Sequence, residues 1–156
     1  MEKLKVRDLC LPCSLALAVK ESDGLEAAIR RFASQPETHA IFVVDNKGKL
    51  KGLVKIRHLL NWIRLKLGVS RERRNITVAE AFEVAKLSQS SQIGDITSPA
   101  VTVKPEDSLA HALNLMANEE VVELAVVNDD GELVGEIKLT QVLSQLLDLG
   151  SSAQGK

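Results

Sequence analysis

The sequence predicts a mixed α/β (α+β) fold in which one βαββα unit occurs twice. Three observations predict it: the front and back of the chain align with each other, each half carries apolar residues at helical spacing, and each carries short apolar runs separated by a glycine turn. With 156 residues, 45% of them hydrophobic, the chain can form one compact domain or two small halves that share a core.

The unit begins with a strand that leads into a helix. The segment 19–25 aligns with the segment 103–109, so the two copies lie 84 residues apart at this point. Asp23 and Asp107 precede the helices, and we expect their carboxylates to cap the free amides of the first turn. Each helix then repeats one apolar stripe at positions i, i+3, i+4 and i+7. The stripes are Leu25, Ala28, Ile29 and Phe32 in the first copy, and Leu109, Ala112, Leu113 and Met116 in the second.

A β-hairpin and a closing helix complete each unit. The apolar runs 41–45 and 124–128 are long enough for a buried strand but too short for a helix, and a turn containing glycine follows each run. The return strands, 50–54 and 133–137, carry glycine at equivalent positions. The closing helices have matching apolar stripes. These are Ile56, Leu59, Leu60 and Ile63 in the first copy, and Leu139, Val142, Leu143 and Leu146 in the second.

The repeat also predicts the organisation of the chain. The flanks match, because Asp8, Leu9 and Pro12 parallel Asp95, Ile96 and Pro99. The predicted parts are a first motif (1–66), a helical linker (67–92), a second motif (93–150) and a small, polar, disordered tail (151–156). The residues inserted between the aligned copies are 61–92, and the linker makes up most of this insertion.

The insertion is predicted to contain a helix of its own. Thr77 and Glu80 have the spacing of a capping box, and Val78, Phe82 and Ala85 form a helical stripe. We expect this helix to pack on the edge of the pair, and a role in binding a partner stays open.

Composition and charge argue against several functional classes. A formal charge of -1, from 20 basic and 21 acidic residues, provides no general attraction to nucleic acid or anionic membrane, and no apolar stretch reaches the roughly 18 residues of a membrane span. The basic cluster Arg71, Arg73 and Arg74 is interrupted by Glu72 and lacks aromatic neighbours that could stack on bases. We interpret it as a solvated loop, with a contact to phosphate or RNA as the weaker alternative.

The residues that could carry metal or catalytic chemistry are scattered. Cys10 and Cys13 form a single CxxC without the second ligand pair of a structural zinc site, and we interpret them as reduced thiols in a cytoplasmic protein. His39, His58 and His111 fall in different predicted elements. We therefore expect no metal site and no enzyme activity.

The ordered set of these segments resembles the CBS (cystathionine-β-synthase) domain consensus. The segments that carry the resemblance are 93–97, 101–105, 107–109, 125–127 and 131–135, and the first copy is similar apart from a three-residue expansion around Cys13 to Leu17. The resemblance implies a Bateman module, in which two motifs pack with pseudo-two-fold symmetry and two modules join as a homodimer. It also implies clefts between the motifs that bind AMP, ATP, S-adenosylmethionine or NADH as regulatory ligands, with no obligatory cofactor.

The family's nucleotide signature is missing from both copies. In the family a Ser or Thr follows the glycine of the return strand and an Asp comes three residues later, so that a carboxylate can accept both ribose hydroxyls. Lys55 and His58 occupy these positions in the first copy, and Lys138 and Gln141 in the second. Losing such a carboxylate removes roughly 1.5–3 kcal/mol of binding. We therefore predict that the two lysines face phosphate or another anion; the alternative is that they are exposed beside empty clefts.

These observations leave two hypotheses. In the first, the chain is a regulatory, homodimeric module that binds a small anionic ligand, an adenosyl nucleotide among the candidates, and acts on an unknown effector. Its predicted ligand residues are Lys55, His58, Thr97, Pro99, Val101, Lys138 and Gln141. In the second, the pair is only a dimerisation or protein-interaction platform.

Overall fold

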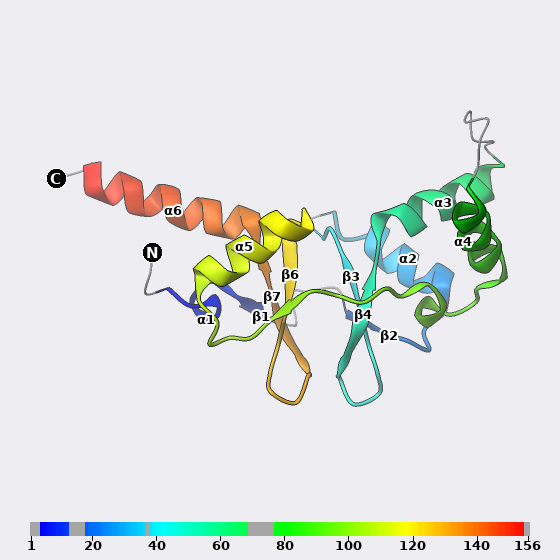
Figure 1. Cartoon of the computed structure of the whole chain (residues 1–156), viewed down its shortest axis with the longest axis horizontal. Coiled ribbons are helices and arrows are strands. Elements are labelled where there is room, and N and C mark those ends of the chain that lie inside the picture. The colour runs from blue at the N-terminus through cyan, green and yellow to red at the C-terminus, as the bar shows by residue number, and fades with distance from the viewer. Residues whose placement is uncertain (1–3, 13–17, 37, 69–76, 155–156) are drawn as a thin grey trace. The chain divides into compact units, whose positions relative to one another are not determined.

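The computed structural model describes residues 4–12, 18–36, 38–68 and 77–154 (Figure 1). Contacts between residues group the chain into two compact units. Unit 1 comprises residues 1–16 and 100–156, and unit 2 comprises residues 17–99. The segment before the first copy thus belongs with the second copy, and the segment before the second copy belongs with the first.

Unit 2 contains a three-stranded sheet with the strand order β2-β3-β4. Strand β2 pairs in parallel with β3, and β3 forms an antiparallel hairpin with β4. The elements are β2 (Ala18–Lys20), α2 (Leu25–Ala33), β3 (Ile41–Val44), β4 (Leu50–Val54), α3 (Ile56–Leu67), α4 (Val78–Gln89) and the 3-10 helix η1 (Ile93–Ile96).

Unit 1 repeats this arrangement with one additional strand, in the order β1-β7-β6-β5. Strand β5 pairs in parallel with β6, and β6 and β7 form the hairpin. The elements are α1 (Val6–Leu9), β1 (Leu11–Pro12), β5 (Thr102–Val103), α5 (Leu109–Glu119), β6 (Glu123–Val127), β7 (Leu133–Lys138) and α6 (Leu139–Gln154). The predicted α/β fold with two βαββα motifs is confirmed.

Each unit has its own hydrophobic core between its helices and one face of its sheet. In unit 2, Ile41, Val43 and Val54 alternate toward the helices and meet Leu25 and Leu59. In unit 1, the corresponding face of β6 and β7 packs against α5 and α6, with Leu124, Val126, Ile137, Leu109 and Val142 in the cluster. Strand alternation therefore decides which side chains enter each core.

Asp23 and Asp107 are not the predicted N-caps. The N-cap residues are Gly24 and Ser108, one position later, and the Ser108 hydroxyl accepts the amide of His111 at 3.1 Å. The aspartates close the preceding turn: Asp23 accepts the amide of Lys20, and Asp107 that of Lys104. A short carboxylate can accept an amide either in the first turn of a helix or in the turn before it. Here both aspartates accept an amide of the preceding turn.

The inserted helix α4 forms where it was predicted, but the buried face is a different one. The Thr77 hydroxyl accepts the amide of Glu80 at 3.2 Å and caps the helix. Val78 and Phe82, from the predicted stripe, are 74% and 72% exposed, whereas Leu87 is 5% exposed and joins the core of unit 2. Seven of the twelve residues of α4 are apolar and they are spread around the helix, so periodicity did not determine which face packs.

The closing helix α6 continues through Gln154. Residues 151–154, which were expected to begin a disordered tail, are therefore helical, and residues 155–156 lie outside the described part of the chain. Once a helix is nucleated, each further residue adds a hydrogen bond at little cost, so small polar residues can extend it.

The flanking segments are hydrogen-bonded to the other copy of the repeat. The amide of Val6 donates to the carbonyl of Asp107, and the amide of Ile93 donates to that of Asp23, both at 2.9 Å. Further along, the flanks pair with the return strands: Leu11 lies opposite Glu136 in β7, and Ser98 exchanges two 2.8 Å hydrogen bonds with Leu53 in β4. The two flanks thus make equivalent contacts, and each makes them with the copy of the repeat that it does not precede in the sequence.

The glycines of the return strands make these crossings possible. A Cβ atom at Gly52 would lie 2.1 Å from the carbonyl oxygen of Ser98, and one at Gly135 would lie 2.1 Å from that of Leu11. Real Cβ atoms do not approach a backbone oxygen so closely, so any side chain would force the crossing segment away.

We predict that Gly52→Ala and Gly135→Ala each lower the free energy of unfolding by about 2 kcal/mol or more, because the clash involves backbone that cannot rotate aside. Urea unfolding monitored by circular dichroism measures this. Gly24→Ala is the matched control, since its Cβ would be 4.0 Å from the nearest atom. Equal stability of the three variants would contradict the prediction.

Candidate functional site

The predicted ligand positions lie at the junction between the return strand and the closing helix of each unit. Lys55 is the N-cap residue of α3, and His58 is its third residue. Lys138 and Gln141 hold the same places at the start of α6, where the Gln141 side chain accepts the amide of Lys138 at 3.4 Å. A lysine has no oxygen with which to accept the amides of the first helical turn, so neither Lys55 nor Lys138 caps its helix through its side chain.

The junction of unit 2 is bordered by the segment that crosses β4. Ser98 pairs with Leu53, and Thr97 lies next to Gly52, with its hydroxyl donating to the carbonyl of Ile93 at 3.0 Å. Pro99 and Lys55 are exposed, and His58 is half-buried. The structure therefore places Lys55, His58, Thr97 and Pro99 in one unit.

The charges around the unit 2 junction are mainly positive. Partial burial holds the pKa of His58 below its ordinary value, and the charge of Arg57 acts in the same direction. Glu83 opposes the shift, while Lys55 and Lys86 add to it. Arg57 is paired with Glu83 across α3 and α4, at 3.1 Å. An anion that reached this junction would therefore meet a neutral imidazole among three cations and one carboxylate.

The junction of unit 1 has the opposite character. The ammonium of Lys138 lies 3.7 Å from a carboxylate oxygen of Glu123 and 3.4 Å from one of Glu136. Glu136 is fully buried and Glu123 is 8% exposed. The alternation of the strands brings the three together, because Glu123 is the register partner of Lys138, and Glu136 is two residues before Lys138 on the same face. Lys138 is thus already opposed by two carboxylates.

Sequence reasoning missed Glu123 and Glu136. Both stand at positions of β6 and β7 that alternate with core residues, and such positions read as ordinary solvent-facing sites in a strand. The available signal was the repeat. Glu136 corresponds to Leu53 in the first copy and Glu123 corresponds to Ala40, and a change from an apolar residue to glutamate between copies marks a difference in environment.

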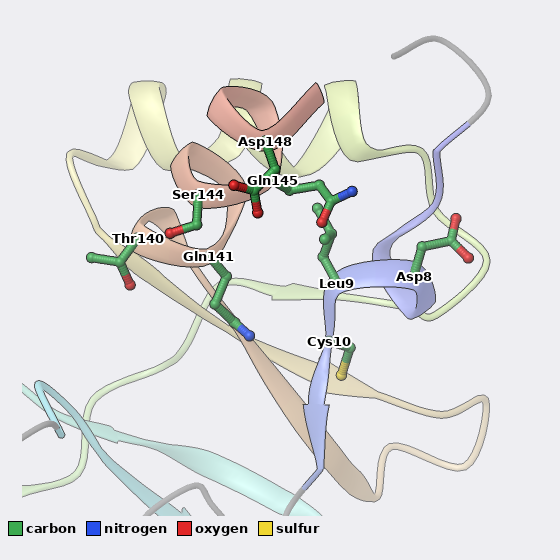
Figure 2. Close-up of a pocket in the computed structure, with 8 residues that line it drawn as sticks. All are labelled: Asp8, Leu9, Cys10, Thr140, Gln141, Ser144, Gln145 and Asp148. Atoms are coloured by element: carbon green, nitrogen blue, oxygen red, sulfur yellow. The ribbon is translucent and has the colours of Figure 1, made fainter. Parts of the chain in front are cut away.

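Unit 1 also contains an open groove of about 410 Å³ between α1 and the first turns of α6 (Figure 2). Gln141 is the predicted ligand residue that lines it. The lining includes two carboxylates, those of Asp8 and Asp148, and no lysine or arginine. The full lining is Asp8, Leu9, Cys10, Thr140, Gln141, Ser144, Gln145 and Asp148. A groove of this composition is unfavourable for a phosphate.

The remaining predicted residue, Val101, belongs to unit 1 and packs against its core. It therefore contributes to packing there. Cys13 and the basic cluster Arg71, Arg73 and Arg74 lie outside the described residues. In the part of the chain that the structure describes, there is no cluster of three or more histidine, cysteine or acidic residues that could hold a metal ion. Nor does any helix in this part have the length and hydropathy required to cross a bilayer.

Comparison with known proteins identifies the family. The model of the CBS domain matches residues 6–65 and again residues 93–148. The chain belongs to the CBS-domain family. The two matches correspond to the two copies of the repeat, and the gap between them contains α4.

Curated relatives of this CBS-domain chain are longer proteins. The magnesium transporter MgtE of Thermus thermophilus is 29% identical over 135 residues, which make up 83% of this chain and 24% of the transporter. The inosine-5'-monophosphate dehydrogenase of Mycobacterium tuberculosis is 41% identical over 64 residues, 41% of this chain and 12% of the enzyme. The chain thus spans about a quarter of the first relative and less of the second.

Solved structures share the fold over nearly the whole chain. The crystal structure of CBSX2 in complex with AMP has a TM-score of 0.73 at 21% identity, covering 94% of this chain and 98% of that one. The cytosolic domain of the Mg²⁺ channel MgtE in complex with ATP has a TM-score of 0.63 at 28% identity, covering 90% of this chain and 48% of that one. CBSX2 is a CBS-pair protein of Arabidopsis thaliana.

The two signature-position lysines should differ strongly in their effect on stability. Lys138→Met leaves two largely buried carboxylates without the ammonium between them, and we expect a loss of about 2 kcal/mol or more at neutral pH. Lys55→Met, at the equivalent exposed position, should change stability by less than about 0.5 kcal/mol.

Urea unfolding of both variants measures this difference. Adding Glu136→Gln to Lys138→Met should recover part of the loss, since it removes one of the buried charges. Equal effects of the two methionine variants would show that Glu123 and Glu136 do not depend on Lys138.

Proposed function

We propose that this CBS pair is a regulatory module that binds a small anionic ligand, with an adenine nucleotide as the first candidate. The observation that carries the proposal is the basic junction of unit 2, where Lys55 is the N-cap residue of α3 and Arg57 and His58 lie in its first turn. The structures of two similar proteins, described as complexes with AMP and ATP, support the choice of ligand class. The proposal assigns no catalytic step to the chain.

The proposed contacts follow from the chemistry of the junction. Lys55 provides an ammonium for a phosphate, and His58 provides a neutral ring nitrogen, which is a weaker partner for a ribose hydroxyl than a carboxylate. Thr97 and Pro99 border the same junction from the crossing segment. Binding would then act on an effector through a change in conformation or in dimer arrangement.

Titration calorimetry of the full chain with AMP, ATP, S-adenosylmethionine and NADH tests the proposal. We expect ATP to bind more tightly than AMP, because its additional phosphates gain most from a basic junction. The affinity for ATP should fall as the salt concentration is raised. Lys55→Gln should lower the affinity for ATP at least about threefold, since it removes one charged contact.

Lys51→Gln is the matched control, because Lys51 is an exposed lysine on β4 of the same unit. Restoring the family signature with Lys55→Thr and His58→Asp should improve AMP binding at the expense of the preference for ATP. Absence of heat with all four compounds would contradict the proposal.

The second candidate function is a dimerisation platform, and one observation favours it. The closing helices expose apolar side chains that a second copy could bury. On α3 these are Ile56, Leu60, Ile63 and Leu67, and on α6 they are Leu143, Leu146 and Leu147, each at least 45% exposed.

We predict that the chain is a homodimer and that Leu60→Glu, or Leu147→Glu, shifts it to a monomer by placing a charge in the apolar contact. Native mass spectrometry and light scattering measure the mass. Leu65→Glu is the control, since Leu65 is also exposed but lies on the opposite side of α3. A monomeric wild-type chain, or no difference between Leu60→Glu and Leu65→Glu, would contradict the prediction.

A further inference from the structure

The inserted helix α4 lies beside the proposed anion site. It packs along α3 and against η1, with Leu87 anchored in the core of unit 2. Its face toward α3 carries Glu83, whose carboxylate reaches the guanidinium of Arg57 at 3.1 Å. Arg57 stands between Lys55 and His58 in the first turn of α3. The insertion therefore contributes side chains to the junction that the family signature occupies.

Two charged residues of α4 act on this junction. Glu83 and Lys86 are three residues apart, so they lie on neighbouring turns of one face. The charged groups that influence His58 are Arg57 and Lys55 from α3, and Glu83 and Lys86 from α4. Counting Lys55, Arg57 and Lys86 as positive and Glu83 as negative, the junction has an excess of positive charge.

We propose that α4 completes the anion site: Lys86 is a further phosphate-binding residue, and Glu83 is an internal competitor that occupies Arg57 until a phosphoryl group displaces it. The inference rests on the proposed function and assigns the inserted helix to the ligand site. A guanidinium presents the same planar fork to a carboxylate and to a phosphate, so the two anions compete for the donors of Arg57.

The exchange at Arg57 is physically reasonable because the existing pair is weakly held. The side chains of Arg57 and Glu83 are 55% and 33% exposed, and solvent screens an ion pair of this exposure. A phosphoryl group with more than one negative charge, placed between Lys55, Arg57 and Lys86, gains from several cations at once. Glu83 thereby favours multiply charged anions over single carboxylates.

The expected result concerns the affinity for pyrophosphate and for ATP, measured by calorimetry at fixed salt. Glu83→Gln should tighten both about two- to fivefold, because it removes the competing carboxylate, and Lys86→Gln should weaken both by a similar factor. Glu119→Gln and Lys47→Gln are the matched controls, exposed residues of α5 and of the β3–β4 turn, and should leave both affinities unchanged.

A second readout is the pKa of His58, followed by NMR titration of its ring protons. In the ligand-free protein, Glu83→Gln should lower this pKa and Lys86→Gln should raise it, because a nearby negative charge favours the imidazolium and a positive charge opposes it. Pyrophosphate should raise it in the wild-type chain, so binding of the anion should strengthen as the pH falls toward the pKa of His58.

The outcomes separate the two proposals. If the wild-type chain binds ATP and pyrophosphate but Glu83→Gln and Lys86→Gln match the controls in affinity and leave the pKa of His58 unchanged, the role of α4 is overturned and the proposed function stands. If the wild-type chain binds neither compound and pyrophosphate does not move the pKa of His58, the proposed function falls, and the role of α4 falls with it.

Discussion

The architecture depends on two close crossings of the backbone. In each unit a flanking segment runs over the return strand at a glycine, Ser98 over Gly52 and Leu11 over Gly135, and no side chain fits between them. The hydrogen bonds at these crossings, together with those from Val6 and Ile93, tie each flank to the opposite copy of the repeat. Because the crossing ends just before the closing helix, it also positions the polar residues at the start of that helix.

The two units share a backbone plan but differ in electrostatics. The first turn of α3 is surrounded mainly by cations, whereas Lys138 at the start of α6 lies against Glu123 and Glu136. Burying a carboxylate pair is costly unless a positive group stays beside it, so Lys138 is needed where it is. Lys55 and Lys138 thus hold equivalent positions of the repeat, but Lys55 is exposed whereas Lys138 is paired with buried carboxylates.

The helix between the copies is held by a mixture of packing and charge. Leu87 fixes α4 to the core of unit 2, Thr77 caps its first turn, and the Arg57–Glu83 pair joins it to α3. Two of its large apolar side chains, Val78 and Phe82, are exposed. The helix therefore presents charged side chains toward α3 and exposes apolar ones elsewhere.

The sequence by itself determined the repeat, the order of the strands and helices of each unit, the apolar faces of α2 and α5 that pack in each core, and the start of α4 at Thr77. These depend on local spacing, which a linear pattern records directly. Only the tertiary structure decided that residues 6–12 serve the second copy, that Leu87 rather than Phe82 packs, and that Glu123 and Glu136 lie beside Lys138. These outcomes depend on which segments meet in space, and neighbours brought together from distant parts of the chain leave no periodicity in the sequence.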